Sequence, residues 1–149
     1  MSGREQDRGL TAVRRVRSAR ETDSRIGLQH ALATLRERDA QAARAADRLD
    51  HAPRFGAGST GEFAAHLIHV GALAHDQART ALAAASSANV ADEATRRWQQ
   101  DRTAVRAVEL LLERRAAERA AERVRREAAE LDDLAAQGWL RRRGQGATR

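Results

Sequence analysis

The chain has 149 residues and a formal net charge of +6, and 34 alanines, 27 arginines, 14 leucines and 11 glutamates fill more than half of it. This composition is typical of a long helix or a coiled coil, and Leu, Ile, Val and Phe together stay below the roughly 20% at which a thick globular core becomes doubtful. The absence of cysteine excludes a disulfide scaffold and a thiolate metal site.

The first predicted helix covers residues from about 10 to 52, a stretch with no proline and only one glycine. Small and apolar side chains recur in it at alternating spacings of four and three, the pattern of a coiled-coil seam, which is the row that faces a partner helix. This row, in which Asp39 is the one polar member, consists of Leu28, Leu32, Leu35, Asp39, Ala42, Ala46 and Leu49. An upstream apolar face, out of phase with the row, consists of Leu10, Val13 and Val16.

Residues 53–61 predict a loop, because they hold the only proline and three glycines. Ser59 and Glu62 have the spacing of a capping box, which starts a helix. A second helix is therefore predicted from about residue 62 to 137, ending at Gly138, with a disordered basic tail at 141–149. Its weakest stretch is 86–89, where polar side chains compete for backbone hydrogen bonds.

The second helix also carries a heptad seam. The row consists of Phe63, Leu67, Val70, Ala74, Gln77, Ala81, Ala84, Ala88, Ala91, Thr95, Trp98, Arg102, Val105 and Leu112. Beyond it the phase shifts to Ala117, Ala121, Val124, Ala128, Leu131 and Ala135, as happens where a coiled coil changes its winding. We expect Trp98 to pack in the seam, whereas Phe63 and Leu67 belong either to the seam or to an exposed docking patch.

Together these elements predict an all-α fold, an antiparallel two-helix coiled-coil hairpin with a longer second helix, as one domain over residues 1–140. At 1.5 Å per residue the first helix is about 65 Å long and the second about 115 Å. Pairing outward from the loop then exhausts the first helix near residue 105. The stretch 106–137 is expected to overhang with an uncovered apolar seam, which is a candidate binding surface.

The sequence gives no sign of an enzyme, a small-molecule substrate, a metal or another cofactor. A two-helix hairpin offers no catalytic cleft. His66 and His69 share a helix face but have no third ligand, and the neighbouring carboxylates Asp132 and Asp133 diverge. No apolar run reaches the roughly 18 residues of a membrane span, and the mixed charges of the N-terminus do not match a secretory signal, so a cytosolic protein is expected.

Arginines form two clusters, one near residues 14–20 and one on the expected overhang. They form either a solvated face paired with glutamates four residues away or a surface for a partner. Nucleic-acid binding favours aromatic side chains among basic ones, and Trp98 and Trp139 lie outside both clusters. Nucleic acid is therefore not the expected partner, although a basic coiled coil that binds nucleic acid and a generic scaffold remain alternatives.

Three elements follow one another in a fixed order in the last third of the chain: Trp98, then Leu111-Leu112-Glu113-Arg114, then Leu131-Asp132-Asp133-Leu134-Ala135. The order and spacing resemble those of the flagellar export protein FliJ family. The chain length and the opening residues Leu10, Val13, Val16, Arg17 and Glu21 are also similar to that family.

The resemblance implies a non-enzymatic component of the flagellar type III export apparatus, a stalk-like coiled coil at the inner face of the cell membrane. Its implied partners are the export ATPase, which it stimulates, the membrane export gate and the export chaperones. The expected ATPase contacts are Arg114, Arg115, Arg119, Arg123, Arg126, Leu131 and Leu134. The family's gate-docking pattern, Phe-x-x-x-Leu, matches Phe63 to Leu67, and a placement one or two turns later fits the distance to Trp98 better. The gate candidates are Phe63, Leu67, Val70 and Leu73, and the seam candidates are Trp98, Val105 and Leu112.

Overall fold

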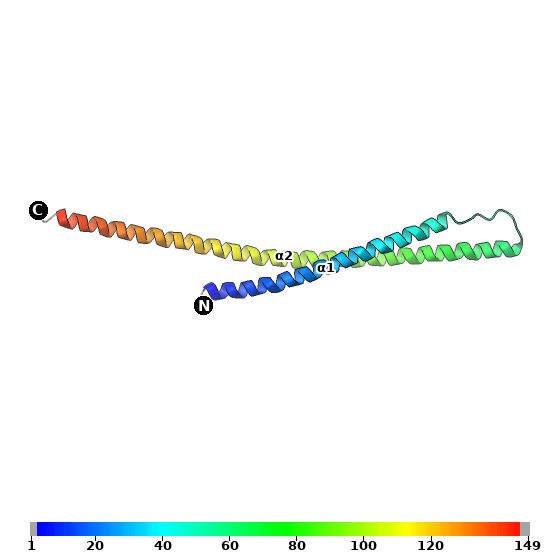
Figure 1. The fold of residues 1–149 in the computed structure, drawn as a ribbon, viewed down its shortest axis with the longest axis horizontal. Helices are drawn as coiled ribbons and strands as arrows, with labels where there is room; N and C mark the ends of the chain where they lie inside the picture. Colours follow the sequence, from blue (N-terminus) through cyan, green and yellow to red (C-terminus); the bar gives the residue numbers. More distant parts are fainter. Residues whose placement is uncertain (1–2, 147–149) are drawn as a thin grey trace. The chain divides into compact units, whose positions relative to one another are not determined.

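The computed structural model describes residues 3–146, with side chains from Asp7 to Arg143. It contains two helices, α1 (Gly3–Asp50) and α2 (Thr60–Gly146), joined by a loop (Figure 1). The helices pack against each other, and residues 3–146 contain no strand. The predicted all-α hairpin with a longer second helix is confirmed.

Both helices extend further than the sequence pattern predicted. α1 begins at Gly3 instead of near residue 10, and α2 continues to Gly146 instead of ending near 137. A glycine inside a helix costs only about 1 kcal/mol relative to alanine, so Gly138 does not end α2. The Arg141 Nε donates to the Gln137 carbonyl oxygen at 3.3 Å, on the far side of this glycine. Residues 141–146 are therefore helical and not the predicted disordered tail, and residues 147–149 lie outside the described range.

The stretch of α2 from Ser86 to Asn89, predicted as its weakest point, is helical throughout. Alanine, the strongest helix former, occupies four of the five preceding positions, and Ala91 and Ala94 follow the stretch. The local competition from two serines and one asparagine is therefore outweighed by its surroundings.

The predicted capping box at the start of α2 is confirmed. The Ser59 backbone N–H donates to Glu62 Oε2 at 2.7 Å, and the Glu62 backbone N–H donates to Ser59 Oγ at 3.3 Å. The backbone N–H and then the hydroxyl of Ser59 lower the pKa of the Glu62 carboxyl below its ordinary value. The ring of Phe55 in the loop lies edge-on to that of Phe63, with centroids 5.1 Å apart, so the loop folds onto the first turn of α2.

The described chain forms two compact parts, of which the first comprises residues 15–105. Its most buried side chains are small: Ala45 and Ala91 are 1% and 3% exposed, and Thr80 is 8% exposed. The Thr80 hydroxyl donates to the carbonyl oxygen of Asp76 at 2.9 Å, so its burial leaves no unsatisfied donor. Because alanine buries little area, this seam contributes less hydrophobic free energy than a leucine seam of the same length.

The seam of α2 follows the predicted row from Ala84 to Trp98 and differs from it at positions on either side of that stretch. The exposed members of the predicted row include Ala74, Ala81 and Arg102. The less exposed residues just before them are Leu73, Thr80 and Asp101. The pattern selected apolar letters, but in an alanine-rich helix neighbouring positions are nearly equivalent in size. The contact with α1 decides the register, and it turns polar Thr80 inward.

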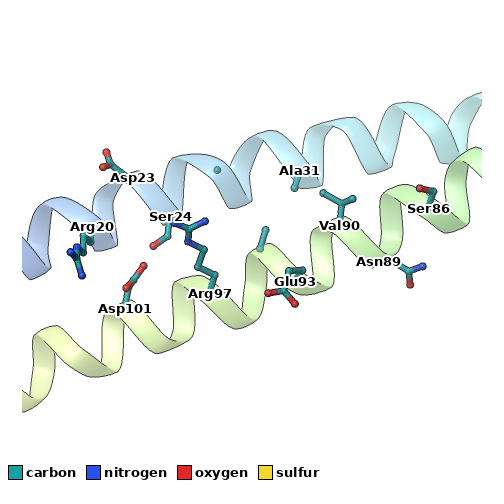
Figure 2. Close-up of a pocket in the computed structure, with 12 residues that line it drawn as sticks. Arg20, Asp23, Ser24, Ala31, Ser86, Asn89, Val90, Glu93, Arg97 and Asp101 are labelled. Atoms are coloured by element: carbon teal, nitrogen blue, oxygen red, sulfur yellow. The ribbon is translucent and has the colours of Figure 1, made fainter.

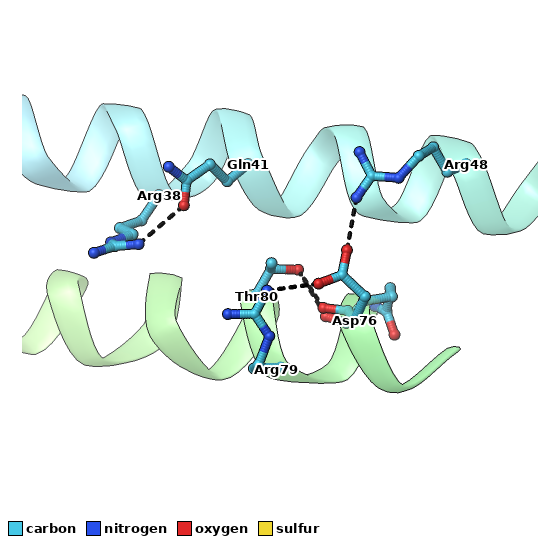
Figure 3. A network of polar contacts seen from close by, with 7 residues as sticks. Arg38, Gln41, Arg48, Asp76, Arg79 and Thr80 are labelled. Carbon is cyan, nitrogen blue, oxygen red and sulfur yellow. Dashed lines mark hydrogen bonds and ion pairs between the residues drawn. The ribbon is translucent and has the colours of Figure 1, made fainter. Parts of the chain in front are cut away.

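Near the loop an ion pair joins the two helices within this first part. Asp76 Oδ2 lies 2.6 Å from Arg48 Nη2 of α1, and Asp76 Oδ1 lies 2.6 Å from Arg79 Nη2 of α2 (Figure 3). Hydrogen bonds from Arg79 and then from Arg48 lower the pKa of the Asp76 carboxyl. An exposed pair of this kind stabilises a fold little, but it fixes which turn of α1 faces which turn of α2.

The second compact part comprises residues up to Arg14 together with those from Arg106 onward. Here Asp7 of α1 contacts α2, with Oδ2 2.6 Å from Arg119 Nη1, and Leu112 is partly buried. From Arg123 to Arg143 every residue except Gly138 is exposed. The overhang therefore begins near residue 123 and not at 106 as predicted, because α1 starts earlier and covers more of α2.

Candidate partner-binding surfaces

An uncovered apolar surface of the second part lies on residues 123–143, here called the C-terminal segment. Its exposed apolar side chains are Val124, Leu131, Leu134, Trp139 and Leu140. Val124 and Leu131 are seven residues apart and Leu134 follows three later, so all three share one helix face. Leu131 is 67% exposed, although leucine is among the residue types most often buried. This face is a candidate docking surface.

Arg123 lies beside this face, whereas Arg125 and Arg126 lie toward the other side of the helix, where they pair along it. Glu122 lies 3.1 Å from Arg126 Nε and 3.0 Å from Arg125 Nη2. The hydrogen bond from Arg126, followed by the charges of Arg125 and Arg126, lowers the pKa of the Glu122 carboxyl. Arg114 forms a similar pair with Glu118 at 2.9 Å. Arg123 is exposed and forms no ion pair with another side chain in the described range.

Three of the predicted ATPase contacts, Arg114, Arg115 and Arg119, lie outside the C-terminal segment, and two of them face Asp7. Arg119 pairs with Asp7 at 2.6 Å, and Arg115 lies 4.0 Å from the other oxygen of the same carboxylate. Their side chains are 45% and 33% exposed. Asp7 was not predicted as a site residue, because it precedes the predicted start of the first helix.

A second exposed apolar surface lies near the loop, in the first part. It comprises Phe63, Leu67 and Ile68, here called the loop-end patch, and all three are exposed. The other two predicted gate candidates, Val70 and Leu73, are partly buried. The predicted set is thus divided between the surface and the seam. Ile68 was missed because it lies between seam positions, where the heptad pattern assigns no contact.

Trp98 and Val105, two of the predicted seam residues, are partly buried in the first part. The Trp98 indole Nε1 donates to Glu21 Oε1 of α1 at 2.8 Å, and the Arg102 guanidinium carbon lies 5.4 Å from the ring centroid. The indole therefore links the two helices through a directional bond as well as through packing.

A groove of 930 Å³ runs between α1 and α2 in the first part (Figure 2). The groove is open at Gly27, where an added Cβ atom would meet nothing within 4 Å. Charged residues from both helices rim it, including Arg20, Asp23, Arg97 and Asp101. Only two helices bound this groove, so it cannot enclose a small molecule as a catalytic cleft does.

Within residues 3–146 no three His, Asp or Glu side chains are placed to hold a metal ion, and neither helix is apolar enough over a sufficient length to cross a bilayer.

Comparison with known proteins bears on both surfaces. The family model described as flagellar FliJ protein matches residues 6–144, which include nearly all of α1 and α2. No curated protein and no solved structure matches the chain. A match of this extent covers the C-terminal segment and the loop-end patch alike. The two-helix chain therefore belongs to the FliJ family, whose members are non-catalytic components of flagellar protein export.

Proposed function

We propose that the chain is a stalk-like coiled coil that docks with the flagellar export ATPase through its C-terminal segment and stimulates it. The observation that supports this proposal is the exposure of Val124, Leu131 and Leu134 on one face of a helix that α1 does not cover. An apolar helix face of this kind is suited to a groove in a partner protein. The arginines of the segment would steer it toward acidic surfaces.

The loop-end patch is the proposed contact for the membrane export gate and for export chaperones. Phe63, Leu67 and Ile68 are exposed there, and the edge-on contact of Phe55 with Phe63 holds the aromatic ring in place. A preorganised aromatic side chain loses little conformational entropy on binding, which favours it as an anchor. Because we propose contacts with the export ATPase and with the membrane export gate, we also propose that the protein lies in the cytoplasm at the inner face of the membrane.

The sharpest test of ATPase docking uses arginines that Asp7 does not contact. Arg123→Glu with Arg126→Glu should slow association with the ATPase about tenfold at low salt and weaken its stimulation, because electrostatic steering is lost. The matched control is Arg36→Glu with Arg38→Glu, which makes the same charge change on exposed positions of α1. The defect should shrink as salt rises and screens the charges. Stopped-flow association and ATP hydrolysis rates measure both effects.

A second double variant, Leu131→Ser with Leu134→Ser, tests the apolar contacts with the ATPase. It should raise the dissociation rate of the complex and leave the association rate nearly unchanged. Full stimulation by both double variants at low salt would refute the proposed docking. If the arginine variant instead lost binding to RNA or DNA while stimulating the ATPase normally, the alternative of a nucleic-acid-binding coiled coil would replace it.

A further inference from the structure

The contact between Asp7 and two arginines brings the beginning of α1 against α2 in the second part. Asp7 Oδ2 lies 2.6 Å from Arg119 Nη1, which is the length of a strong charge-assisted hydrogen bond. The Thr11 hydroxyl donates to the Asp7 carbonyl oxygen at 2.7 Å and so supports the same turn of α1. One carboxylate thus faces a pair of guanidinium groups that lie one helical turn apart.

Only one of the two carboxylate oxygens of Asp7 is closely paired in this contact. Asp7 Oδ1 is buried, lies 4.0 Å from Arg115 Nη1 and has no hydrogen-bond partner among the described residues. A buried oxygen without a partner carries a desolvation cost that a complete contact would remove. Guanidinium groups bind carboxylates best when both oxygens are engaged. A carboxylate that reached both arginines would therefore bind better than Asp7 does.

The nearby acidic groups of α2 are engaged elsewhere. Glu118 pairs with Arg114 at 2.9 Å, and Glu122 pairs with Arg125 and Arg126. In the described range, Asp7 is therefore the carboxylate that lies against Arg115 and Arg119. Exchange of this one group would release both arginines to a partner.

We propose that Arg115 and Arg119 form a carboxylate-binding site, which Asp7 fills in the free protein and an acidic side chain of the docked partner fills in the complex. The identity of that partner as the export ATPase rests on the proposed function, whereas the site itself rests on the contacts of Asp7. In this arrangement Asp7 is an internal competitor, so docking at the site detaches the first turns of α1 from α2.

The test compares Asp7→Asn with Asp39→Asn, an exposed residue of α1 whose substitution changes the net charge equally. The probes are hexaglutamate, a model acidic peptide, and the export ATPase. Because an ion pair that water still reaches is worth about 1 kcal/mol, Asp7→Asn should bind each probe about two- to fivefold more tightly than the wild type. Asp39→Asn should bind like the wild type. In an Arg119→Gln background, the gain from Asp7→Asn should vanish.

Detachment of α1 has a separate readout, because the chain lacks cysteine and can be labelled at two introduced ones. Spin labels at Arg8→Cys and Ala116→Cys, both at exposed positions, should move apart when hexaglutamate saturates the site. Unchanged label distances at saturation would overturn the proposal. So would equal affinity of Asp7→Asn and wild type, or a gain that persists in the Arg119→Gln background.

The two probes keep this site and the proposed function apart. If hexaglutamate gives the expected pattern while the ATPase binds none of the variants, the carboxylate site stands and the proposed function fails. If Arg123→Glu with Arg126→Glu weakens ATPase stimulation but Asp7→Asn shows no gain with either probe, the proposed function stands and the site fails.

Discussion

Two lengths of α2, one packed against α1 and one not, differ in which side chains they bury. In the first part the most buried residues are small, such as Ala91, while Leu82 is 74% exposed. In the C-terminal segment large apolar residues such as Leu131 are exposed because α1 does not reach them. In this chain contact of a position with α1, and not residue size, decides what is buried. The paired length should therefore be sensitive to changes of side-chain volume, and the unpaired length should be sensitive only when a partner is bound.

The largest expected effect on stability comes from replacing Trp98, the largest side chain of the length of α2 that packs against α1. Trp98→Ala should lower the free energy of unfolding by about 3 kcal/mol, since the packing of the indole and its hydrogen bond to Glu21 are both lost. Urea unfolding followed by circular dichroism at 222 nm measures the change. Trp98→Phe serves as the control, because it keeps most of the packing and should lose only about 1 kcal/mol. An unchanged midpoint for Trp98→Ala would mean that the indole does not hold the helices together.

Next in size is a matched pair of volume changes in the two lengths. Ala45→Leu should destabilise the protein by about 1 to 3 kcal/mol, because the added carbons do not fit between the helices. Leu131→Ala, the reverse change in the C-terminal segment, should alter the free energy of unfolding by no more than about 0.5 kcal/mol. The same urea experiment compares them. Equal losses for the two variants would show that the C-terminal segment is covered in the free protein, and the contrast between the lengths would disappear.

The smallest effect concerns the capping box at the start of α2. Ser59→Ala removes the hydroxyl that accepts the Glu62 backbone N–H and should cost about 1 kcal/mol. Thermal unfolding at neutral pH measures this loss. Thr60→Ala is the control, since Thr60 is the adjacent hydroxyl-bearing residue and has no role in the box.

The pH dependence checks the cause of that loss. The pKa of Glu62 is lowered in the folded protein, so its stabilising contribution is present above the ordinary pKa of a glutamic acid. It is lost as the pH falls through that value and below it. The difference between Ser59→Ala and wild type should therefore narrow in acid. If the stability difference between the two proteins stayed constant through this pH range, the loss would come only from the bond between the Ser59 hydroxyl and the Glu62 backbone N–H, and not from the Glu62 carboxylate.

The features that the sequence predicted well are those set by nearby residues. The two helices, the intervening loop and the Ser59–Glu62 capping box follow from periodicity, a proline and spacings of three or four residues. The start of α1 at Gly3 was not predictable in this way, because its first turns have weak local signals and contact α2. The Asp7 contact was missed with it. The register of α2 was predicted wrongly at Ala74 and Ala81 for another reason. Alanines at neighbouring positions do not differ in size, so the pattern could not distinguish between them, and Thr80 was left out because it is polar.

The ladder of contacts between the helices also has a consequence for the order in which the chain folds. The Arg48–Asp76 pair joins residues 28 apart in sequence, and the Trp98–Glu21 bond joins residues 77 apart. The entropy lost in closing a loop grows with its length, so contacts next to the capped loop are expected to form first and the Asp7–Arg119 contact last. Opening runs in reverse, and amide hydrogens around Asp7 should exchange with solvent sooner than those around Asp76. Arg115 and Arg119, the arginines of the proposed carboxylate-binding site, thus lie where α1 and α2 are expected to separate most readily.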